Sequence, residues 1–277
     1  MVLEKLTIGT VQIDCNMENK EDNIQKVEKI LDHYGPKTDI LCFPELFTTG
    51  YHLEQIDQNK FYELAEEIPG PTVTRLSQKA KEYHTAIVGS IVEKDRDLQA
   101  VLYDTAFVIN EKGEYVGKYR KAHLYPTEHQ YFRSGSSFPI FKVFGIPVGV
   151  AICYDHAFLE QFRILALKGA QIIFIPSVIP KNYEYLLDLR TRARAQDNQV
   201  FTVASNRVGQ EGGIIYCGRS KIVNPKGEIV SEGNDQESVV TGLIALGEID
   251  SERKQEPVFR NRRPELYQLL SQTEANS

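Results

Sequence analysis

The sequence predicts an α/β fold built as a single domain. Short runs rich in β-branched residues recur along the chain, and amphipathic helical patterns lie between several of them. No Pro-, Gly- or Ser-rich linker divides the 277 residues. At about 150 residues per domain, the length alone allows one large domain or two small ones. Two sheets covered by helices on their outer faces would satisfy the alternation.

The strands are predicted where valine, isoleucine, threonine and aromatic residues dominate. These runs cover residues 6–13, 39–43, 85–92, 100–109, 114–120, 146–153, 170–177, 199–205, 218–224 and 238–246. The segments NEKGE (110–114) and NPKGE (224–228) predict hairpin turns, because glycine readily adopts the positive φ that such turns need.

Four helices are predicted between these strands. In residues 19–34, Ile24, Val27 and Leu31 recur at helical spacing with charged residues opposite. The other helices are expected at 72–84, after a Pro-Gly-Pro break, and at 158–170 and 184–198. No internal repeat is visible in the sequence. The polar tail from residue 251 is expected to pack as an arm with a final short helix.

Composition excludes several classes of protein. A hydrophobic content of 42% and a charged content of 25% exclude intrinsic disorder, and four cysteines are far too few for a disulfide scaffold. The net charge of −6 argues against nucleic-acid binding, and we expect no nucleic-acid partner. The one arginine-rich run, Arg190, Arg192 and Arg194, alternates with acidic residues, and we interpret it as salt-bridged packing.

The N-terminal residues lack the pattern of a signal peptide, and no apolar run approaches the ~20 residues of a membrane helix. We therefore expect a cytoplasmic protein that does not bind membranes. In that reducing compartment its four cysteines would be thiols.

Cys153 is the cysteine whose position suggests chemistry. It ends the predicted strand 146–153, and a helix is predicted to begin a few residues later. The positive end of that helix would favour a thiolate, which is a nucleophile. Cys15, Cys42 and Cys217 have no such position and are expected to be packing residues. The cysteine and histidine spacings fit no zinc site, so we expect no metal.

Three charged residues also follow predicted strands. Glu45 lies just beyond the apolar run 39–43, Lys121 directly follows the strand 114–120, and Glu128 comes seven residues later. In layered α/β folds the strand ends meet at one edge, where active sites are usually built. A nucleophile, a base, a fixed cation and a second acid together suit attack on an amide carbonyl.

At this point the motifs resemble a known family. PELFTTGY (44–51), YRKAHLYPTE (119–128) and VGVAICYDHAF (148–158) are similar to motifs of the nitrilase, or carbon–nitrogen hydrolase, superfamily. The resemblance implies a four-layer αββα sandwich over residues 1–246, followed by a C-terminal arm (247–277). It also implies a Glu45–Lys121–Cys153 triad, with Glu128 supporting the lysine. Leu159 departs from the proline that is common at its position.

The resemblance implies hydrolysis of a small-molecule amide through a cysteine thioester, with no metal or organic cofactor. Lys121 and the backbone N–H of Tyr154 would stabilise the oxyanion. Tyr154–Asp155 follows the cysteine, where true nitrilases usually carry Trp-Glu, so an amidase or N-carbamoyl amide hydrolase is favoured over a nitrilase. The expected pocket residues are Tyr51, His129, Tyr154 and the loop 176–180, which includes Ser177 and Val178.

Other possibilities stay open from sequence. A member of the same fold can transfer the acyl group to an amine instead of water, or can be a non-catalytic binding module, although an intact triad argues against the latter. Asn206 and Arg207 could close the sheet end, or Arg207 could bind an acidic substrate. Family members usually associate, so a homodimer or larger homo-oligomer is implied, through residues 158–169 and the tail.

Overall fold

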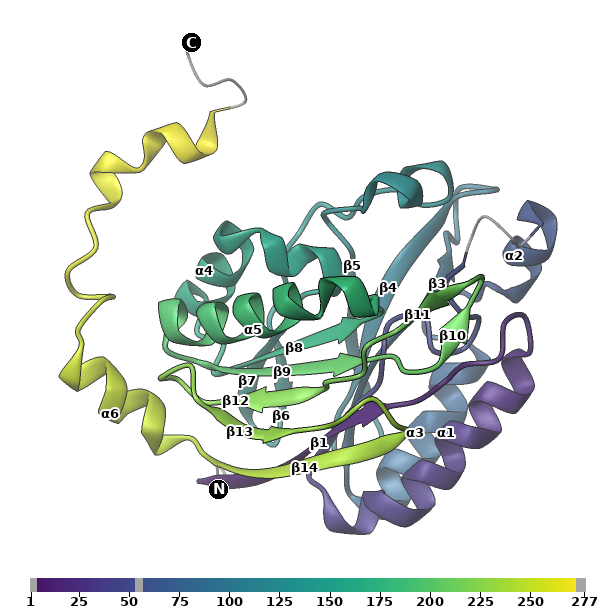
Figure 1. Cartoon of the computed structure of the whole chain (residues 1–277), viewed down its shortest axis with the longest axis horizontal. Helices are drawn as coiled ribbons and strands as arrows, with labels where there is room; N and C mark the ends of the chain where they lie inside the picture. The colour runs from purple at the N-terminus through teal and green to yellow at the C-terminus, as the bar shows by residue number, and fades with distance from the viewer. Residues whose placement is uncertain (1–3, 53–56, 273–277) are drawn as a thin grey trace.

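Two six-stranded sheets lie face to face, with helices on the outer side of each (Figure 1). The computed structural model describes residues 4–52 and 57–272. The layers run helix, sheet, sheet, helix, which confirms the predicted αββα sandwich. None of the helices in these described ranges is long and apolar enough to span a membrane.

The first sheet has the strand order β14-β1-β2-β3-β4-β5. β1, β2 and β3 are parallel, while β4, β5 and β14 pair antiparallel with their neighbours. Its strands are β1 (Lys5–Gln12), β2 (Ile40–Cys42), β3 (Ala86–Lys94), β4 (Leu102–Ile109), β5 (Tyr115–Arg120) and β14 (Ser238–Ala245).

The second sheet has the order β13-β12-β9-β8-β7-β6, and β7, β8 and β9 are its parallel strands. Its strands are β6 (Phe141–Val143), β7 (Ile146–Val150), β8 (Ile172–Ser177), β9 (Phe201–Asn206), β12 (Lys221–Val223) and β13 (Ile229–Glu232). A separate two-stranded ribbon, β10 (Gln210–Glu211) and β11 (Ile214–Ile215), follows β9.

The two sheets repeat one topology. Each has three parallel strands joined by helices, then an antiparallel hairpin, and each is extended by one antiparallel strand on the other side. The hairpins turn at NEKGE and NPKGE, where Asn110 Oδ1 and Asn224 Oδ1 each accept two backbone N–H groups. This repeat is not visible in the sequence, because the halves share their strand order and only short segments of similar sequence such as NEKGE and NPKGE.

Helices cover the outer faces. α1 (Lys20–Tyr34) and α3 (Pro71–Tyr83) pack on the first sheet, and α4 (Leu159–Leu167) and α5 (Glu184–Asn198) lie over the second (Figure 1). The four helix predictions are confirmed to within a few residues. α1 begins where Asn19 accepts the N–H of Asp22 and buries Ile24, Val27 and Leu31. A shorter helix, α2 (Gln58–Leu64), was not predicted.

Successive side chains of a strand point to opposite faces of the sheet, and both faces are buried. On β2, Ile40 and Cys42 face the second sheet, while Leu41 and the following Phe43 face α1 and α3. Ser205 of β9 donates through its hydroxyl to the carbonyl of Val11, which fastens the sheets together near their centre. Because both faces are covered, the ends of the strands are where polar side chains can gather.

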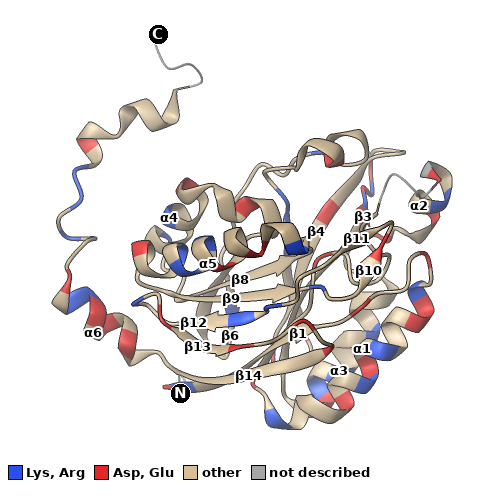
Figure 2. Cartoon of the chain, in the orientation of Figure 1, with Lys and Arg blue, Asp and Glu red and all other residues tan. Residues whose placement is uncertain are grey.

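The arginine-rich run on α5 is confirmed in part as packing. Arg192 pairs with Asp188 and Arg194 with Asp197, whereas Arg190 contacts the ring of His156. Charges of both signs are interspersed over the helices (Figure 2).

Asn206 and Arg207 have structural roles, and Arg207 is not available to bind an acidic substrate. Arg207 is buried and pairs with Glu211 and Asp14. Asn206 accepts the N–H of Ile179 at 2.7 Å, which fastens the loop after β8.

The C-terminal arm only partly follows the prediction. α6 (Gly247–Gln255) and the chain to Phe259 stay against the second sheet's helices, where Arg163 of α4 lies 5.0 Å from the Phe259 ring. Beyond Phe259 the arm leaves the body of the molecule (Figure 1), and Leu266, Leu269 and Leu270 are exposed. The expectation that the whole arm packs is therefore wrong for its last part, which has two short 3₁₀ helices, η6 (Pro264–Leu266) and η7 (Gln268–Ser271).

Candidate active site

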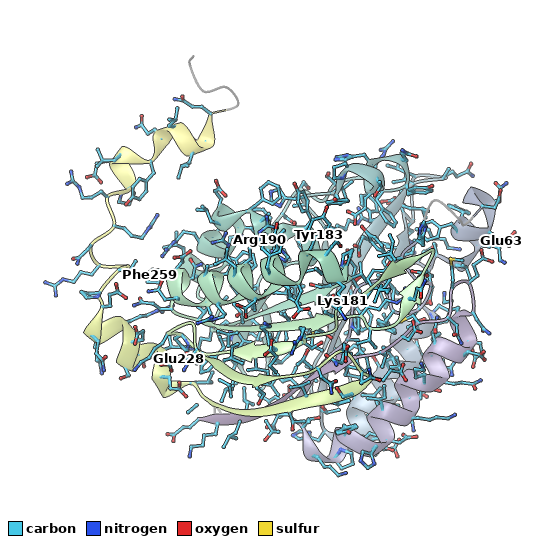
Figure 3. All side chains as sticks on the ribbon, in the orientation of Figure 1. Glu63, Lys181, Tyr183, Arg190, Glu228 and Phe259 are labelled. Carbon is cyan, nitrogen blue, oxygen red and sulfur yellow. The ribbon has the colours of Figure 1, made fainter. Side chains whose placement is uncertain are left out.

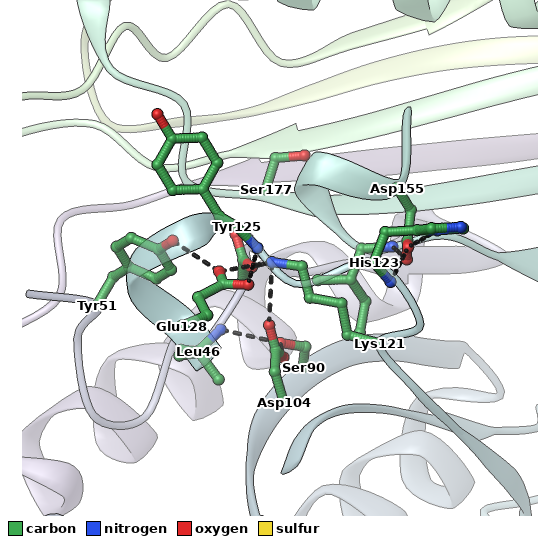
Figure 4. Close-up of polar contacts among 12 residues, drawn as sticks. Leu46, Tyr51, Ser90, Asp104, Lys121, His123, Tyr125, Glu128, Asp155 and Ser177 are labelled. Atoms are coloured by element: carbon green, nitrogen blue, oxygen red, sulfur yellow. Dashed lines mark hydrogen bonds and ion pairs between the residues drawn. The ribbon is translucent and has the colours of Figure 1, made fainter. Parts of the chain in front are cut away.

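Glu45, Lys121 and Glu128 meet in a buried cluster of opposite charges. Lys121 Nζ lies 2.7 Å from Glu128 Oε1 (Figure 4) and 2.6 Å from Glu45 Oε1. None of the three side chains reaches solvent. A fourth group, Asp104, has its Oδ2 3.6 Å from the same nitrogen. The structure thus brings the predicted acid, cation and second acid together and adds one carboxyl group.

Glu45, Lys121 and Asp104 are placed by strands of the first sheet. Glu45 follows β2 after Pro44, and Lys121 directly follows β5. The backbone N–H of Lys121 donates to the carbonyl of Asp104 on β4 at 2.9 Å, so the lysine is aligned by the neighbouring strand. The ends of two strands of the same sheet, β2 and β5, therefore bring these side chains together, as the sequence predicted.

Glu128 is held by a short helix and a tyrosine. It lies in the 3₁₀ helix η3 (Pro126–Gln130), and its Oε2 accepts the backbone N–H of Tyr125 at 2.8 Å. Its Oε1 accepts the hydroxyl of Tyr51 at 2.6 Å (Figure 4). These bonds fix the carboxylate against Lys121 and leave it little freedom to move.

Lys121 and Glu45 both have raised pKa values, but with different consequences for their charge. Burial alone would lower the pKa of Lys121, but the carboxylates of Glu128, Glu45 and Asp104 outweigh it and raise the pKa well above its ordinary value. The lysine is thus a permanent cation. Burial raises the pKa of Glu45 well above its usual range, although Lys121 opposes the shift. A carboxyl group with a raised pKa holds its proton to a higher pH than usual, which suits acid–base chemistry.

Asp104 was missed by the sequence analysis. Its Oδ1 accepts the Ser90 hydroxyl at 2.8 Å, and Ser90 Oγ accepts the N–H of Leu46 at 3.0 Å. Burial raises the pKa of Asp104 to about 6. Asp104 Oδ2 and Glu45 Oε2 are buried without a hydrogen-bond partner among the described residues. The available signal was a lone aspartate inside the apolar run AVLYDTAFVI.

Cys153 comes from the second sheet. β7 ends at Val150, three residues earlier than predicted, and Cys153 is the first residue of the 3₁₀ helix η4 (Cys153–Ala157), with φ of 43°. Burial raises the pKa of the Cys153 thiol well above its ordinary value, and the Glu45 carboxylate adds to this while Lys121 opposes it. The expectation of a thiolate is therefore wrong for the resting site, because desolvation outweighs the short helix.

Asp155 braces the cysteine turn. Its Oδ1 accepts the N–H of His123 at 3.0 Å (Figure 4). Its Oδ2 accepts the N–H of Ile152 at 2.8 Å and the hydroxyl of Tyr119 at 2.7 Å. Tyr119 and His123 flank Lys121 in the chain. This buried carboxylate thus connects the segment that carries the lysine with the segment that carries the cysteine.

A cavity of about 470 Å³ opens over Cys153. Of the predicted pocket residues, Tyr51, Tyr154 and Val178 line it. The wall of the cavity is largely apolar and aromatic, which is usual for a small-molecule site. The structure also places His156, Tyr183, Arg190 and Tyr216 in its wall, none of which the sequence analysis named for this purpose.

Two predicted pocket residues lie elsewhere. His129 is exposed and is not part of the cavity wall, because it follows Glu128 in a 3₁₀ helix, where successive side chains point about 120° apart. Ser177 is fully buried, and its hydroxyl donates to the carbonyl of Ile175 at 3.1 Å.

The acid cluster already contains a cation. Glu45, Asp104 and Glu128 offer oxygen atoms within 4.8 Å of one another, a grouping that could bind a metal ion. The Lys121 ammonium lies among these oxygens, at 2.6, 3.6 and 2.7 Å. These carboxyl oxygens therefore suit the Lys121 ammonium that they already surround, and they do not suit a metal ion beside it.

Comparisons with known proteins identify the family. A model of the carbon-nitrogen hydrolase family matches residues 7–254. A nitrilase of Pyrococcus abyssi is 35% identical over 94% of this chain and 98% of its own length. The 2-oxoglutaramate amidase of Bacillus subtilis is 34% identical over 95% of this chain and 100% of its own length.

Solved structures agree. The crystal structure of a carbon-nitrogen hydrolase from Helicobacter pylori superposes with a TM-score of 0.87 at 25% identity and covers 98% of this chain and 100% of that one. The fold, the matched length and the sequence similarity lead to the same assignment, and the chain belongs to the carbon-nitrogen hydrolase family.

Proposed function

We propose that the chain is an amidase that hydrolyses the C–N bond of small linear carboxamides through a thioester on Cys153. The observation that carries this proposal is the position of Cys153, which lines the cavity and whose thiol is influenced by the charges of the buried Glu45–Lys121–Glu128 cluster. A thiol, a base with a raised pKa and a fixed cation are the groups that acyl transfer requires.

In the proposed reaction, Glu45 accepts the thiol proton as the sulfur of Cys153 attacks the amide carbon. A base is needed because the resting thiol is neutral, and the raised pKa of Glu45 suits it to receive that proton. The tetrahedral intermediate collapses when Glu45 gives the proton to the leaving nitrogen, and ammonia or an amine departs. Glu45 then deprotonates a water molecule, which cleaves the thioester to the acid.

The developing oxyanion is proposed to be stabilised by Lys121 and the backbone N–H of Tyr154. Lys121 cannot lose its charge in this surrounding, since three carboxyl groups raise its pKa. Glu128 keeps the ammonium in place and in turn is held by Tyr51.

An amide is favoured over a nitrile by the residues after the nucleophile. Tyr154 lines the cavity, and Asp155 is wholly committed to bracing the turn. The Tyr-Asp pair matches the amidase pattern, and the chain holds no tryptophan for the Trp-Glu pattern of nitrilases. A nitrilase, or an acyl transferase using an amine in place of water, is the alternative.

The test is ammonia release from a panel of short amides, carbamoyl amines and the matching nitriles. We expect the wild type to release ammonia from amides and Cys153→Ala to lose at least about 1,000-fold in kcat. Cys15→Ala, which removes a buried thiol outside the cavity wall, is the control and should stay active.

Three results would contradict the proposal. Undiminished release by Cys153→Ala would exclude the thioester, and turnover of nitriles alone would assign a nitrilase. Product formed only after hydroxylamine or an amine is added would assign a transferase.

We also propose that residues 1–246 form the catalytic domain and that 247–277 serve association into a homo-oligomer in the cytoplasm. Exposed apolar side chains on α4 and on the arm, Leu159, Leu167, Leu266, Leu269 and Leu270, support the association. Four unbridged, buried cysteines support a reducing compartment.

A further inference from the structure

The charge distribution of the cavity wall is one-sided. Among the described residues that line it there is one arginine, Arg190, two histidines, and no lysine, aspartate or glutamate. The remaining lining side chains are aromatic, aliphatic, amide or hydroxyl groups. A ligand in this cavity therefore meets one full positive charge and no negative charge from these residues.

Arg190 reaches the cavity from α5 (Figure 3) and differs from its neighbours on the same helix. Arg192 pairs with Asp188 and Arg194 with Asp197. Within the ranges 4–52 and 57–272, no carboxylate pairs with Arg190, whose recorded side-chain contact is His156 Nε2 at 3.0 Å. A guanidinium has five N–H donors, so most of its capacity is available to a ligand.

His156 holds the guanidinium in place. Because arginine only donates, His156 Nε2 must accept, and the imidazole is neutral with its proton on Nδ1. Burial, with the charges of Arg190 and Arg194, lowers the pKa of His156 to about 3, which agrees with that assignment. His156 is 3% exposed and comes three residues after Cys153 in the chain. The cysteine turn and the arginine are thus fastened to each other.

We propose that Arg190 is a specificity-determining residue that binds a carboxylate at the far end of the substrate, so that the preferred substrates are short ω-amides of dicarboxylic acids. The inference rests on the proposed amidase function. With the amide carbon at Cys153 and the carboxylate at Arg190, one small molecule would contact both. A guanidinium binds a carboxylate through two parallel hydrogen bonds and repels an ammonium. The same site therefore selects against amides that end in an amine.

The test compares three substrates of similar length, succinamate, butanamide and 4-aminobutanamide, with wild type and Arg190→Gln. We expect the ratio of kcat/KM for succinamate over butanamide to fall about 10- to 100-fold in Arg190→Gln, mainly through KM, because a charge-assisted bond is lost. Arg190→Glu should shift the preference toward 4-aminobutanamide.

Arg192→Gln is the matched control, since that arginine is two residues away on α5, is paired with Asp188 and is not part of the cavity wall. It should leave the substrate ratio unchanged. Circular dichroism melting of each variant shows that folding is retained. An unchanged ratio in Arg190→Gln, or wild-type preference for butanamide over succinamate, would overturn the proposal while the amidase function stands.

A binding measurement separates this proposal from the proposed function. Calorimetry of succinamate with Cys153→Ala measures recognition without turnover, and Arg190→Gln in that background should weaken binding by a similar factor. If no amide is hydrolysed, the amidase function is wrong, and the calorimetry still decides whether Arg190 binds the carboxylate. Equal affinity with and without Arg190 would contradict that role.

Discussion

At the scale of single residues, the site contains more carboxyl groups than cations. Glu45, Asp104 and Glu128 surround one ammonium out of reach of water. An uncompensated buried charge is costly, so this arrangement favours a proton retained on one of the carboxyl groups. The raised pKa values of Glu45 and Asp104 express that preference. A substitution at Asp104 is therefore expected to change the pKa of Glu45.

Asp104→Asn should flatten the pH dependence of stability between pH 4.5 and 7. The folded-state pKa of Asp104, about 6, lies above its ordinary value of 3.8, so the unfolded chain loses this proton first as pH rises. Stability is then fully present at low pH and is lost as pH rises through the folded pKa. Asparagine has no proton to lose, and urea unfolding at both pH values measures the difference.

Asp95→Asn is the control for that prediction. Backbone N–H groups of Asp97 and Leu98 lower the pKa of Asp95, so it titrates below this pH window. The substitution should change stability by a similar amount at both pH values. If Asp104→Asn keeps the wild-type slope, the carboxyl group of Asp104 does not hold the proton.

At the scale of elements, the two hairpin turns permit a direct comparison. Gly113 and Gly227 both have positive φ, 76° and 79°, in turns of nearly the same sequence. A Cβ on Gly113 would lie 2.3 Å from the carbonyl oxygen of Ser77 on α3, whereas at Gly227 the nearest atom, the carbonyl oxygen of Arg192 on α5, is 3.2 Å away. Both turns contact their helices, but the first leaves no space for a Cβ, whereas the second leaves a tight contact that a small shift would relieve.

Gly227→Ala should cost about 1–2 kcal/mol of unfolding free energy, because alanine resists the left-handed conformation. Gly113→Ala should cost roughly 1–3 kcal/mol more, since the backbone of α3 must also move. Chemical denaturation of the two variants beside wild type gives both values. Equal losses would show that the contact with α3 relaxes at no cost.

The elements that sequence could predict were those with strong local patterns. The helix at 184–198 matches α5, and the strand ends placed Glu45 and Lys121 correctly. Effects that depend on tertiary packing could not be predicted from the sequence. Burial, which reverses the expected ionisation of Cys153, and the contact of Arg190 with His156 depend on residues distant in the chain. The direction of the His129 side chain depends on a 3₁₀ turn that no sequence period reveals.

At the scale of the whole molecule, the arm beyond Phe259 has exposed leucines and few contacts with its own chain. Such a segment gains stability only from another surface. Removing residues 260–277 should lower the oligomeric mass measured by light scattering at several concentrations, while the melting temperature of the domain changes little.

A variant that lacks only the last five residues is the control, because that segment is polar and should not change the mass. An unchanged mass after removal of 260–277 would place the association surface elsewhere, for example on α4.

The order in which the chain leaves the ribosome bears on when the site can exist. The acids and the lysine belong to the first sheet, and Cys153 follows in the second, but β14 pairs with β1 from more than 220 residues away. Until β14 has been synthesised, the outer edge of β1 has no partner. A nascent chain that already contains the acids, the lysine and the cysteine therefore still has an incomplete first sheet, and we expect the proposed site to form only after β14 has joined it.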